Sequence, residues 1–509
     1  MIIFIEAPNN WQDRETVKVK NYGILRIISY IKSKGYPEGI ECYDFSFNSA
    51  NYDKAIEHAE SLPYADVYAF SVMESNYLNS LKMAEMLKRR NKCTIVFGGS
   101  SATELGREIL ETHNFIDYVI YGANEGSFYK LLIKRPEEIP NLIWRRSEIV
   151  IKNPIEYPFP EWQTIMPVDI DWNSNGEYSQ DKFIVSTSLG CIAKCDFCNI
   201  VVKEPKLYER EIKYVTEEIK QDILIAKKKG VDKIFVQIMH QNFLHRLDEL
   251  MISLKNNNLL DNIHSIAFNS RADTFLAEQC QKTMIHTLEE YPFITFNVYI
   301  GIESYVQETL NEIGKIINVN KNIEATRRLI EFKHKYENFY YSLSFIGLCY
   351  NTTEEHIRRN IAEIRKLFEN EAYPAHYLFY SPLRLGVTLA HKFRKERKKG
   401  HYMENNFFQP FEEGNFAYPK DIRMQHLLNK FYYHAAHLPD FTIRKKAYQD
   451  LNQRNLITFS KEEFFRYVHA EICILEALLD NKDPYEIISN VNNIFNTLLR
   501  HVQMELVKA

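Results

Sequence analysis

Three of the eight cysteines in this 509-residue chain lie within one short segment. Cys191, Cys195 and Cys198 form a C-x3-C-x2-C pattern soon after the apolar run Phe183-Ile184-Val185, which predicts a strand. Such a loop can direct three thiolates at one inorganic centre, and iron–sulfur clusters are usually held by four. Three close ligands leave one position open for a substrate or cosubstrate, as at catalytic zinc sites. The spacing therefore indicates a metal centre with an open coordination position.

A structural zinc site and a chance group of buried thiols are the alternatives to an iron–sulfur cluster. Zinc would need a fourth Cys or His nearby, and the nearest later histidine is His240. Free cysteine is also a common core residue. The remaining cysteines are scattered, and we expect them to be buried thiols without disulfides: Cys42, Cys93, Cys280, Cys349 and Cys473.

The cysteine segment, with the aromatic Phe197 before its last cysteine, resembles the cluster loop of the radical S-adenosylmethionine (SAM) enzymes. The resemblance implies a [4Fe-4S] cluster whose open iron binds the amino and carboxylate groups of SAM. It further implies one-electron cleavage of SAM to a 5′-deoxyadenosyl radical, with an electron donor such as flavodoxin or ferredoxin.

Residues at the ends of three later strands are predicted to contact SAM. The stretch Gly301-Ile302-Glu303-Ser304 resembles the family's fourth-strand element, whose carboxylate and hydroxyl lie near the SAM ribose and carboxylate. The alternative is an ordinary turn with Ser304 as a helix N-cap. Arg271, after the third strand, is expected either to reach the SAM carboxylate or to form a surface ion pair.

The segment after the second strand departs from the family pattern. Many members place glycines and acids there to hold the methionyl amino group. This chain instead offers Gln237, Gln241 and Asn242 as side-chain acceptors, and we predict Gln237 as the SAM contact. His240 is expected to be a packing residue, with a general acid or base as the alternative.

Residues 1–132 alternate short apolar runs with helical patterns, which predicts a Rossmann-like parallel α/β sheet. Ligands of such sheets bind at the loops that follow the strands. The expected strands are 2–5, 41–45, 67–70, 94–97 and 118–121, and the expected helices are 22–34, 53–61, 77–90 and 102–112.

The order of these elements and their loops resemble the cobalamin-binding domain that precedes the radical core in a large subclass of the family. Glycines there would let the backbone approach a bulky ligand. The D-x-H-x-x-G element that gives cobalt a histidine in many cobalamin proteins has no counterpart in residues 6–11, as in many members of this subclass. A vestigial domain that binds nothing is the alternative. The predicted cobalamin contacts are Asn9, Glu74, Ser75, Gly98, Gly99, Gly122 and Glu125.

Three further regions follow this domain. Residues 133–175 are proline-rich and predict a linker with a hairpin near 143–151. Residues 176–386 contain six β/α units, too few for an eight-stranded barrel. The last strand is expected at 377–380, and the expected helices include 212–228 and 273–289. The resemblance implies a partial (β/α)6 TIM-type barrel. Residues 387–509 predict a helical region with a helix over 461–479. This region starts with a basic run, 391–399, and a possible lid, 402–419.

Composition limits the partners and the compartment. The chain has 63 basic and 67 acidic residues, a formal charge of −4, so no nucleic acid or anionic membrane is expected as a partner. The amino terminus lacks a signal-peptide pattern, and no apolar run reaches the roughly 18 residues of a membrane helix. We expect a cytoplasmic protein.

These features predict a radical SAM enzyme that abstracts hydrogen from an unactivated carbon of a small-molecule or peptide substrate. With cobalamin, the resemblance implies C-methylation or a radical rearrangement in a biosynthetic pathway. A cobalamin-independent member that thiolates, transfers an aminocarboxypropyl group or rearranges its substrate is one alternative. A sensor that binds a cluster or cobalamin without turnover is another.

Overall fold

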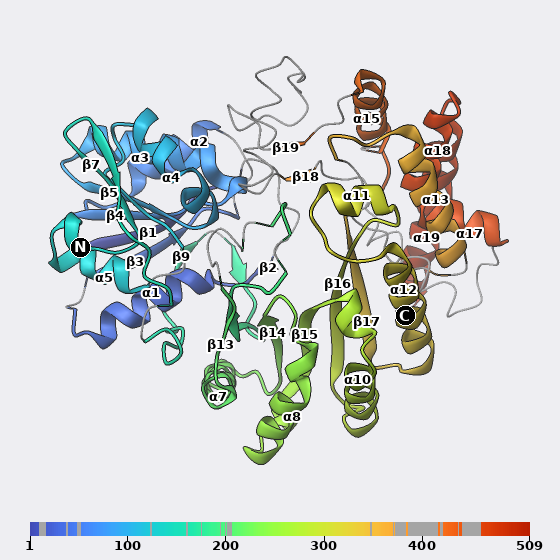
Figure 1. Cartoon of the computed structure of the whole chain (residues 1–509), viewed down its shortest axis with the longest axis horizontal. Helices are drawn as coiled ribbons and strands as arrows, with labels where there is room; N and C mark the ends of the chain where they lie inside the picture. Colours follow the sequence, from blue (N-terminus) through green and yellow to red (C-terminus); the bar gives the residue numbers. More distant parts are fainter. Residues whose placement is uncertain are drawn as a thin grey trace. The chain divides into compact units, whose positions relative to one another are not determined.

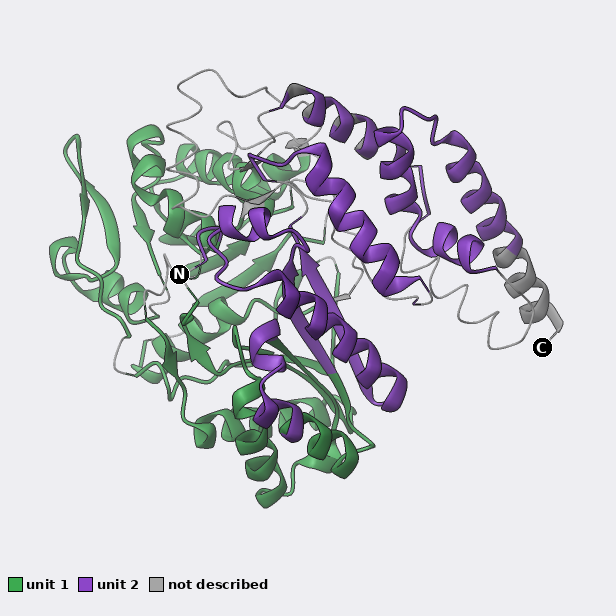
Figure 2. Cartoon of the chain, turned by 45° about the vertical axis from the view of Figure 1, so that its right-hand side comes forward, with its two compact units in different colours: residues 1–194, 198–269, 283–296 green, residues 195–197, 270–282, 297–509 purple. Residues whose placement is uncertain are grey.

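The computed structural model of the chain forms two compact units, which are described separately (Figures 1 and 2). Unit 1 comprises residues 1–194, 198–269 and 283–296, and unit 2 comprises residues 195–197, 270–282 and 297–509. The residues that the structure describes are 1–9, 17–36, 39–47, 52–122, 125–158, 161–174, 176–193, 195–198, 200, 206–346, 349–369, 371, 383–384, 416–417, 421–435, 437–439 and 460–508.

Unit 1 begins with a doubly wound sheet of eight strands in the order β8-β7-β6-β5-β4-β1-β3-β9. The first five strands along the chain run parallel, and their order reverses between β1 and β4. Ligands bind beyond the carboxyl ends of the strands at such a switch point. The strands are β1 (Ile2–Glu6), β3 (Ile40–Asp44), β4 (Val67–Ser71), β5 (Thr94–Gly98), β6 (Tyr118–Ile120), β7 (Leu142–Arg146), β8 (Ile149–Lys152) and β9 (Asn173–Ser174).

Helices cover this sheet on both faces, as a parallel sheet requires. One buried cluster joins the sheet to α2, α3 and α4 through Ala55, Met83 and Ile109, and the other joins it to α1 and α5 through Ile28 and Phe128. The helices are α1 (Tyr22–Ser33), α2 (Tyr52–Ser61), α3 (Tyr77–Arg90), α4 (Ser100–Thr112) and α5 (Glu125–Ile133).

The predicted parallel α/β sheet is confirmed, with two differences. Helix α5 has no counterpart among the expected helices, because it is short and begins with Glu125-Gly126. The predicted hairpin is present as β7 and β8, but it pairs antiparallel with β6 and extends the sheet. Its buried residues Leu142 and Ile143 explain this position, since a free connector would expose them.

A second sheet contains the strands that the sequence predicts for the radical SAM core. Its strand order is β11-β14-β15-β16-β17, and β11, β14 and β15 pair in parallel. The expected sixth strand, 377–380, lies outside the described residues. The strands are β11 (Lys182–Ser186), β14 (Ile234–Met239), β15 (Ile263–Arg271), β16 (Thr295–Glu303) and β17 (Phe339–Phe345).

Helices follow each of these strands, as expected for a partial barrel. Helix α7 occupies its predicted residues, whereas the helix expected over 273–289 is broken between Phe275 and Glu278. The helices are α7 (Ile212–Lys228), α8 (Leu247–Asn256), α9 (Ala272–Phe275), α10 (Glu278–Glu290), α11 (Gln307–Glu312), α12 (Val319–Lys335) and α13 (Glu354–Phe368).

Among the described residues, three pairs of short strands lie outside the main sheets, and the sequence pattern predicts none of them. Strands β12 (Ser188–Leu189) and β13 (Tyr208–Glu209) pair antiparallel on either side of the cysteine loop. Strands β2 (Val17–Lys18) and β10 (Glu177–Tyr178) pair in parallel. Strands β18 (Leu383–Arg384) and β19 (Phe416–Ala417) pair antiparallel.

The described residues of the carboxyl-terminal region are mainly helical, as predicted. Ser460 and Glu463 form a capping box at the start of α17, and the helix expected over 461–479 breaks at His469. The basic run and most of the possible lid lie outside the described residues. None of the helices searched in the described part of the chain could cross a membrane. The helices are α15 (Ile422–Ala435), α17 (Lys461–Val468), α18 (Ala470–Leu479) and α19 (Tyr485–Lys508).

Candidate functional site

The cysteine loop follows the carboxyl end of β11, where the sequence predicts it. Gly190 turns the chain with a left-handed φ of 80° immediately before Cys191. The Cys191 sulfur accepts the backbone N–H of Ala193 at 3.4 Å. All three cysteines of the loop are partly exposed and carry free thiols.

The other five cysteines differ from these three in burial. Each is buried, and burial raises the pKa of each thiol, to about 12 for Cys42 and for Cys473. Metal ligation requires the thiolate. The contrast fits the assignment of the cluster to the three loop cysteines, and it confirms the prediction that the remaining thiols are buried.

Gly314, which the sequence analysis does not single out, constrains the loop at Asp196, and both residues belong to unit 2. Gly314 has a φ of +66°, and a Cβ there would lie 2.5 Å from the carboxylate carbon of Asp196. The Asp196 N–H donates to the carbonyl oxygen of Ile313 at 3.0 Å. Only glycine fits this turn without displacing Asp196, which stands between the second and third cysteines.

Glu303 ends β16 with its carboxylate buried in an ion pair. Lys315 Nζ lies 3.1 Å from Glu303 Oε1, Ser344 Oγ donates to Oε2 at 3.0 Å, and the Glu303 and Lys315 side chains are only 7% and 5% exposed. The Glu303 backbone has a φ of +66°. A non-glycine residue held there indicates local strain, which clusters at functional sites.

Ser304 has a structural environment in the same turn. Its side chain is fully buried, and its hydroxyl donates to Asn360 Oδ1 at 3.2 Å. The Ser304 hydroxyl oxygen also accepts the Val306 N–H at 3.1 Å. The N-cap of α11 is Val306, so Ser304 is not the cap of that helix. The Ser304 hydroxyl is buried in this network, and its direct contact with SAM stays a prediction.

Arg271 and Gln237, the other two predicted SAM contacts, also end or line strands. The Arg271 guanidinium forms a two-pronged pair with Asp273, at 2.9 and 2.8 Å. Burial alone would raise the pKa of Asp273. The hydrogen bonds and charge of Arg271 outweigh this effect, so the pKa of Asp273 is lowered. Gln237 is half-buried in β14, on the strand face opposite Val236 and Ile238.

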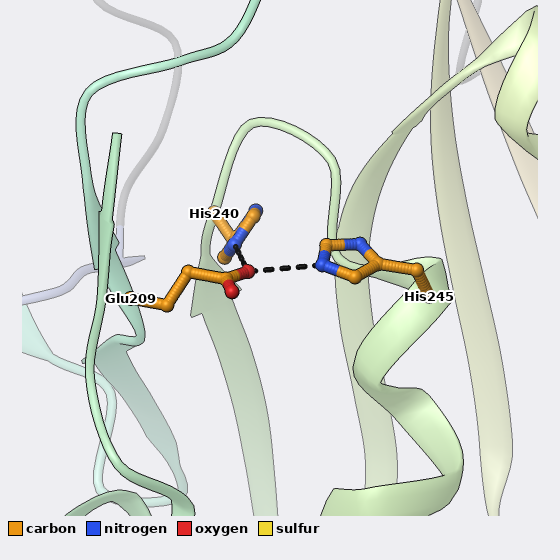
Figure 3. Close-up of side chains that lie close together, drawn as sticks. All are labelled: Glu209, His240 and His245. Carbon is orange, nitrogen blue, oxygen red and sulfur yellow. Dashed lines mark hydrogen bonds and ion pairs between the residues drawn. The ribbon is translucent and has the colours of Figure 1, made fainter. Parts of the chain in front are cut away.

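His240 belongs to a cluster of three polar side chains that includes two residues the sequence analysis misses (Figure 3). Glu209 Oε1 lies 3.3 Å from His240 Nε2 and 2.9 Å from His245 Nε2. His240 is buried, and burial lowers its pKa to about 4, so it is neutral at pH 7. The close sequence pair His240 and His245 was the available signal.

The hydrogen bonds of this cluster argue against a metal centre, although its ligand atoms all lie within 4.8 Å of one another. The Asn242 N–H donates to His240 Nδ1 at 2.9 Å, so Nδ1 carries no proton. A neutral His240 then has its proton on Nε2, which donates to Glu209 and has no lone pair for a metal. Metal-ligating histidines instead donate through their other nitrogen. These hydrogen bonds make His240 a poor metal ligand, and its role as a packing residue, with a general acid or base as the alternative, stays a prediction.

The predicted cobalamin contacts lie at the carboxyl edge of the first sheet. Asn9 follows β1 and Ser75 follows β4, the two strands at the switch point, and Glu74 lies beside Ser75 in a 3-10 helical turn. Gly98 ends β5. Gly99 has a φ of +97°, and a Cβ on it would lie 2.7 Å from the Val72 carbonyl oxygen. The strand order thus brings these loops to one edge.

The last two predicted contacts differ from each other in accessibility. Gly122 has a φ of +75°, and its N–H donates to Thr103 Oγ1 at 3.0 Å. The Glu125 carboxylate lies in a buried ion pair, 2.5 Å from Arg26 Nε, with side chains 11% and 7% exposed. Glu125 therefore stabilises the packing of α5 on α1, and its contact with cobalamin stays a prediction.

A pair of carboxyl groups that the sequence analysis does not single out lies at the ends of β1 and β3. Glu6 and Asp44 are cross-strand neighbours. Asp44 accepts the Tyr178 hydroxyl at 2.6 Å, and Asn21 Nδ2 donates to Glu6 at 3.4 Å. Burial and the Asp44 charge raise the pKa of Glu6 to about 8, against weaker opposition from Asn21 and Lys18.

Two family models match the chain. The B12 binding domain matches residues 16–132, and the radical SAM superfamily matches residues 185–364. Among curated proteins, a tRNA-2-methylthio-N(6)-dimethylallyladenosine synthase from Anaplasma phagocytophilum (strain HZ) is 21% identical over 301 residues, 58% of this chain. The match spans 61% of that relative's length.

Solved structures show a similar fold. OxsB, a cobalamin-dependent SAM radical enzyme solved with aqua-cobalamin and SAM bound, matches with a TM-score of 0.64 and 14% identity over 100% of this chain and 80% of that one. TsrM, a radical SAM methyltransferase from Kitasatospora setae solved with cobalamin and a [4Fe-4S] cluster bound, matches with a TM-score of 0.56 and 13% identity over 72% of this chain and 73% of that one.

Proposed function

We propose that this chain, which has the domain pair and the fold of the cobalamin-dependent radical SAM enzymes, methylates an unactivated carbon of a small-molecule or peptide substrate. One observation carries the proposal. A partly exposed C-x3-C-x2-C loop follows β11 of the radical SAM domain, in a chain that also carries a B12 binding domain. When bound, the cluster and SAM would supply radical chemistry and cobalamin would supply a methyl carrier.

The loop fits a cluster by the chemistry of its donors. Cys191, Cys195 and Cys198 are partly exposed residues with free thiols, and they would hold three of the four irons. Each of the other cysteines is buried with a raised pKa, so the described residues offer no second set of thiolates. One site with an open position is what SAM binding requires.

Glu303 is the strongest of the proposed SAM residues. Lys315 and Ser344 hold its two carboxylate oxygens, and its left-handed backbone fixes where the carboxyl group leaves β16. A buried carboxylate in this position orients a polar partner without large motion of its own. Two hydrogen bonds to Asp273 orient the Arg271 guanidinium, the other charged group that we propose for SAM.

The first sheet supports cobalamin through its backbone. The loops after β1, β4, β5 and β6 meet at the switch-point edge, and Gly98, Gly99 and Gly122 leave it without large side chains. Residues 7–16 contain no histidine, so this loop would give cobalt no imidazole ligand. Asn9 and Ser75 are the polar side chains that we assign to the cofactor.

The test uses full-length protein reconstituted anaerobically with iron, sulfide and hydroxocobalamin, a chemical reductant, and SAM that carries a deuterated methyl group. The reaction also contains a small-molecule and peptide extract of the cells that make the enzyme, as the source of substrate. The expected result is 5′-deoxyadenosine and S-adenosylhomocysteine in comparable amounts, with the deuterated methyl group on a carbon of one compound of that extract. 5′-Deoxyadenosine alone would favour a rearrangement. If neither product is formed, the result would contradict an enzyme and favour a sensor.

Methylthiolation is the competing outcome, because the curated relative is a methylthio synthase. A product that gains sulfur together with the methyl group would support it and contradict C-methylation. Mass spectrometry separates the two, since methylthiolation adds one more sulfur atom to the product. The buried state of the other cysteines argues against a second cluster as the sulfur source.

A further inference from the structure

Ser186 is the last residue of β11, directly before the segment that carries the cysteines. In the described sheet β11 is an edge strand. The Thr187 N–H donates to Met239 of the neighbouring strand at 3.2 Å, so the backbone groups of Ser186 face away from β14. Edge groups of this kind need other partners.

Two side chains supply these partners. The Ser186 N–H donates to the hydroxyl oxygen of Tyr22 at 3.1 Å, and Arg210 Nη1 donates to the Ser186 carbonyl oxygen at 3.2 Å. Tyr22 is the first residue of α1 and lies within the B12 binding match, whereas Arg210 follows β13 in the radical SAM match. One residue of each domain therefore holds the end of β11.

A single carboxylate aligns both side chains. The Tyr22 hydroxyl donates to Glu218 Oε1 at 3.0 Å, and Arg210 Nη1 donates to Glu218 Oε2. The Arg210 and Glu218 side chains are both 0% exposed. Because the Tyr22 proton points to Glu218, its oxygen lone pair is left for the Ser186 N–H. Buried networks in which every member is satisfied fix a single arrangement.

The network is anchored at the connector between the two domains. Arg210 Nε donates to the Gln163 carbonyl oxygen at 2.6 Å and Nη2 to that of Ile165 at 3.2 Å. From α1, Arg26 donates to the carbonyl oxygens of Ile165 and Trp162 at 2.7 and 2.8 Å. Two arginines, one from each domain, thus hold the same four-residue segment.

We infer that Tyr22 is a positioning residue through which the B12 binding domain fixes the start of the cysteine loop. The contact is one hydrogen bond from the Ser186 N–H to the Tyr22 hydroxyl. Glu218 orients that hydroxyl, and Arg210 holds the Ser186 carbonyl oxygen. This inference rests on the proposed function, because it takes the cysteine loop to be the site of an iron–sulfur cluster. The contact itself exists in the chain without any cofactor.

The first measurement is hydrogen–deuterium exchange in full-length protein without cofactors. Tyr22→Phe keeps the ring and removes the hydroxyl, so the Ser186 amide should exchange about tenfold faster, the effect of losing one net hydrogen bond. Tyr30→Phe is the matched control, because its hydroxyl lies on the same helix and bonds Glu161 at 3.3 Å. Unchanged exchange in Tyr22→Phe would overturn the inference.

The second measurement follows iron loss to a chelator after reconstitution. A loop whose first residue is no longer held should release iron several-fold faster in Tyr22→Phe than in wild type or Tyr30→Phe. Faster exchange with an unchanged rate of iron loss would show that the hydroxyl stabilises the strand end only, and would overturn the positioning role. If the wild type binds no iron, the proposed function fails, while the exchange experiment still decides the Tyr22 contact.

Discussion

The two sheets present their candidate sites in different ways. At the edge of the first sheet the predicted contacts are mainly backbone positions, such as Gly98, Gly99 and Gly122, whose conformation leaves room for a large ligand. In the radical core the predicted contacts are side chains. Glu303, Ser304 and Arg271 each have close protein partners. The first site is formed mainly by backbone at glycines, and the second is formed by side chains that hydrogen bonds and ion pairs hold in place.

This difference has a physical cause. A glycine after a strand needs no partner, so its role follows from backbone geometry alone. A buried carboxylate or guanidinium must be paired, because an uncompensated buried charge is costly. Charged residues predicted as ligand contacts therefore also serve the fold, and substitutions there change stability as well as binding.

Replacement of the loop cysteines should have the largest effect. Cys191→Ser, Cys195→Ser or Cys198→Ser each removes a thiolate, and we expect iron to fall from about four per chain to below about one. Cys280→Ala, which removes a buried thiol, should leave iron unchanged. Iron analysis of anaerobically reconstituted protein measures this. Retention of iron after any loop replacement would contradict the assignment.

Breaking the two buried ion pairs should have the next largest effect. Glu125→Ala leaves Arg26 unpaired in the first domain and Glu303→Ala leaves Lys315 unpaired in the core, so each should lower the free energy of unfolding by about 3–5 kcal/mol. Urea unfolding followed by circular dichroism measures the loss.

The exposed pair between Glu85 and Arg89 is the control for these variants. Glu85→Ala should change the free energy of unfolding by less than about 1 kcal/mol, because surface pairs contribute little. Equal losses in the exposed and the buried pairs would show that charged contacts in the two sheets carry no special structural role.

Substitution at adjacent glycines tests the backbone-organised edge. Gly99→Ala must place a Cβ 2.7 Å from the Val72 carbonyl oxygen at a φ of +97°, and we expect a loss of about 1–3 kcal/mol and weaker cobalamin binding. Gly98→Ala meets its nearest protein atom at 3.9 Å, so it should keep its stability and is the stability control. Cobalamin titration by absorbance compares Gly99→Ala with wild type. Equal binding by these two proteins would contradict the proposed role of Gly99.

A further expected effect is a pH dependence of stability from Glu6. Its pKa is raised from 4.5 to about 8, so between these values the folded protein binds more protons than the unfolded chain. Stability from this group is present at low pH and falls as pH rises towards 8. The charged groups that act on Glu6 are Asp44, which favours protonation, and Lys18, which opposes it.

Glu6→Gln should remove this contribution, because the amide cannot ionise. Unfolding free energies measured from pH 5 to pH 8.5 should therefore fall less steeply in the variant than in wild type. Parallel curves for the two proteins would show that Glu6 ionises normally. Glu6 would then behave like an exposed carboxyl group despite its position at the end of β1.

Much of the fold follows from the sequence because its signals are local. Helices such as α3 and α7 have the expected bounds, since their apolar spacing is regular and turn residues flank them. The hairpin β7–β8 is also local, but its pairing with β6 is not. Short strands such as β12 and β13 depend on contacts between distant segments, which periodicity does not report.

The candidate site is only partly visible in the sequence for the same reason. The three loop cysteines are close in sequence and can be recognised from spacing. The partners of Glu125, Glu303 and Ser186 come from other elements, and Tyr22 lies 164 residues from the strand end that it holds. Whether a carboxylate is free or paired depends on such contacts, so charged residues were the least predictable members of the site.

The most direct test of two differently organised sites in one chain is the metal content of three proteins prepared in parallel. Wild type should bind about four irons and one cobalamin per chain. Cys195→Ser should lose iron and keep cobalamin, and Gly99→Ala should keep iron and bind less cobalamin. Zinc in place of iron, or no cobalamin in the wild type, would contradict the account.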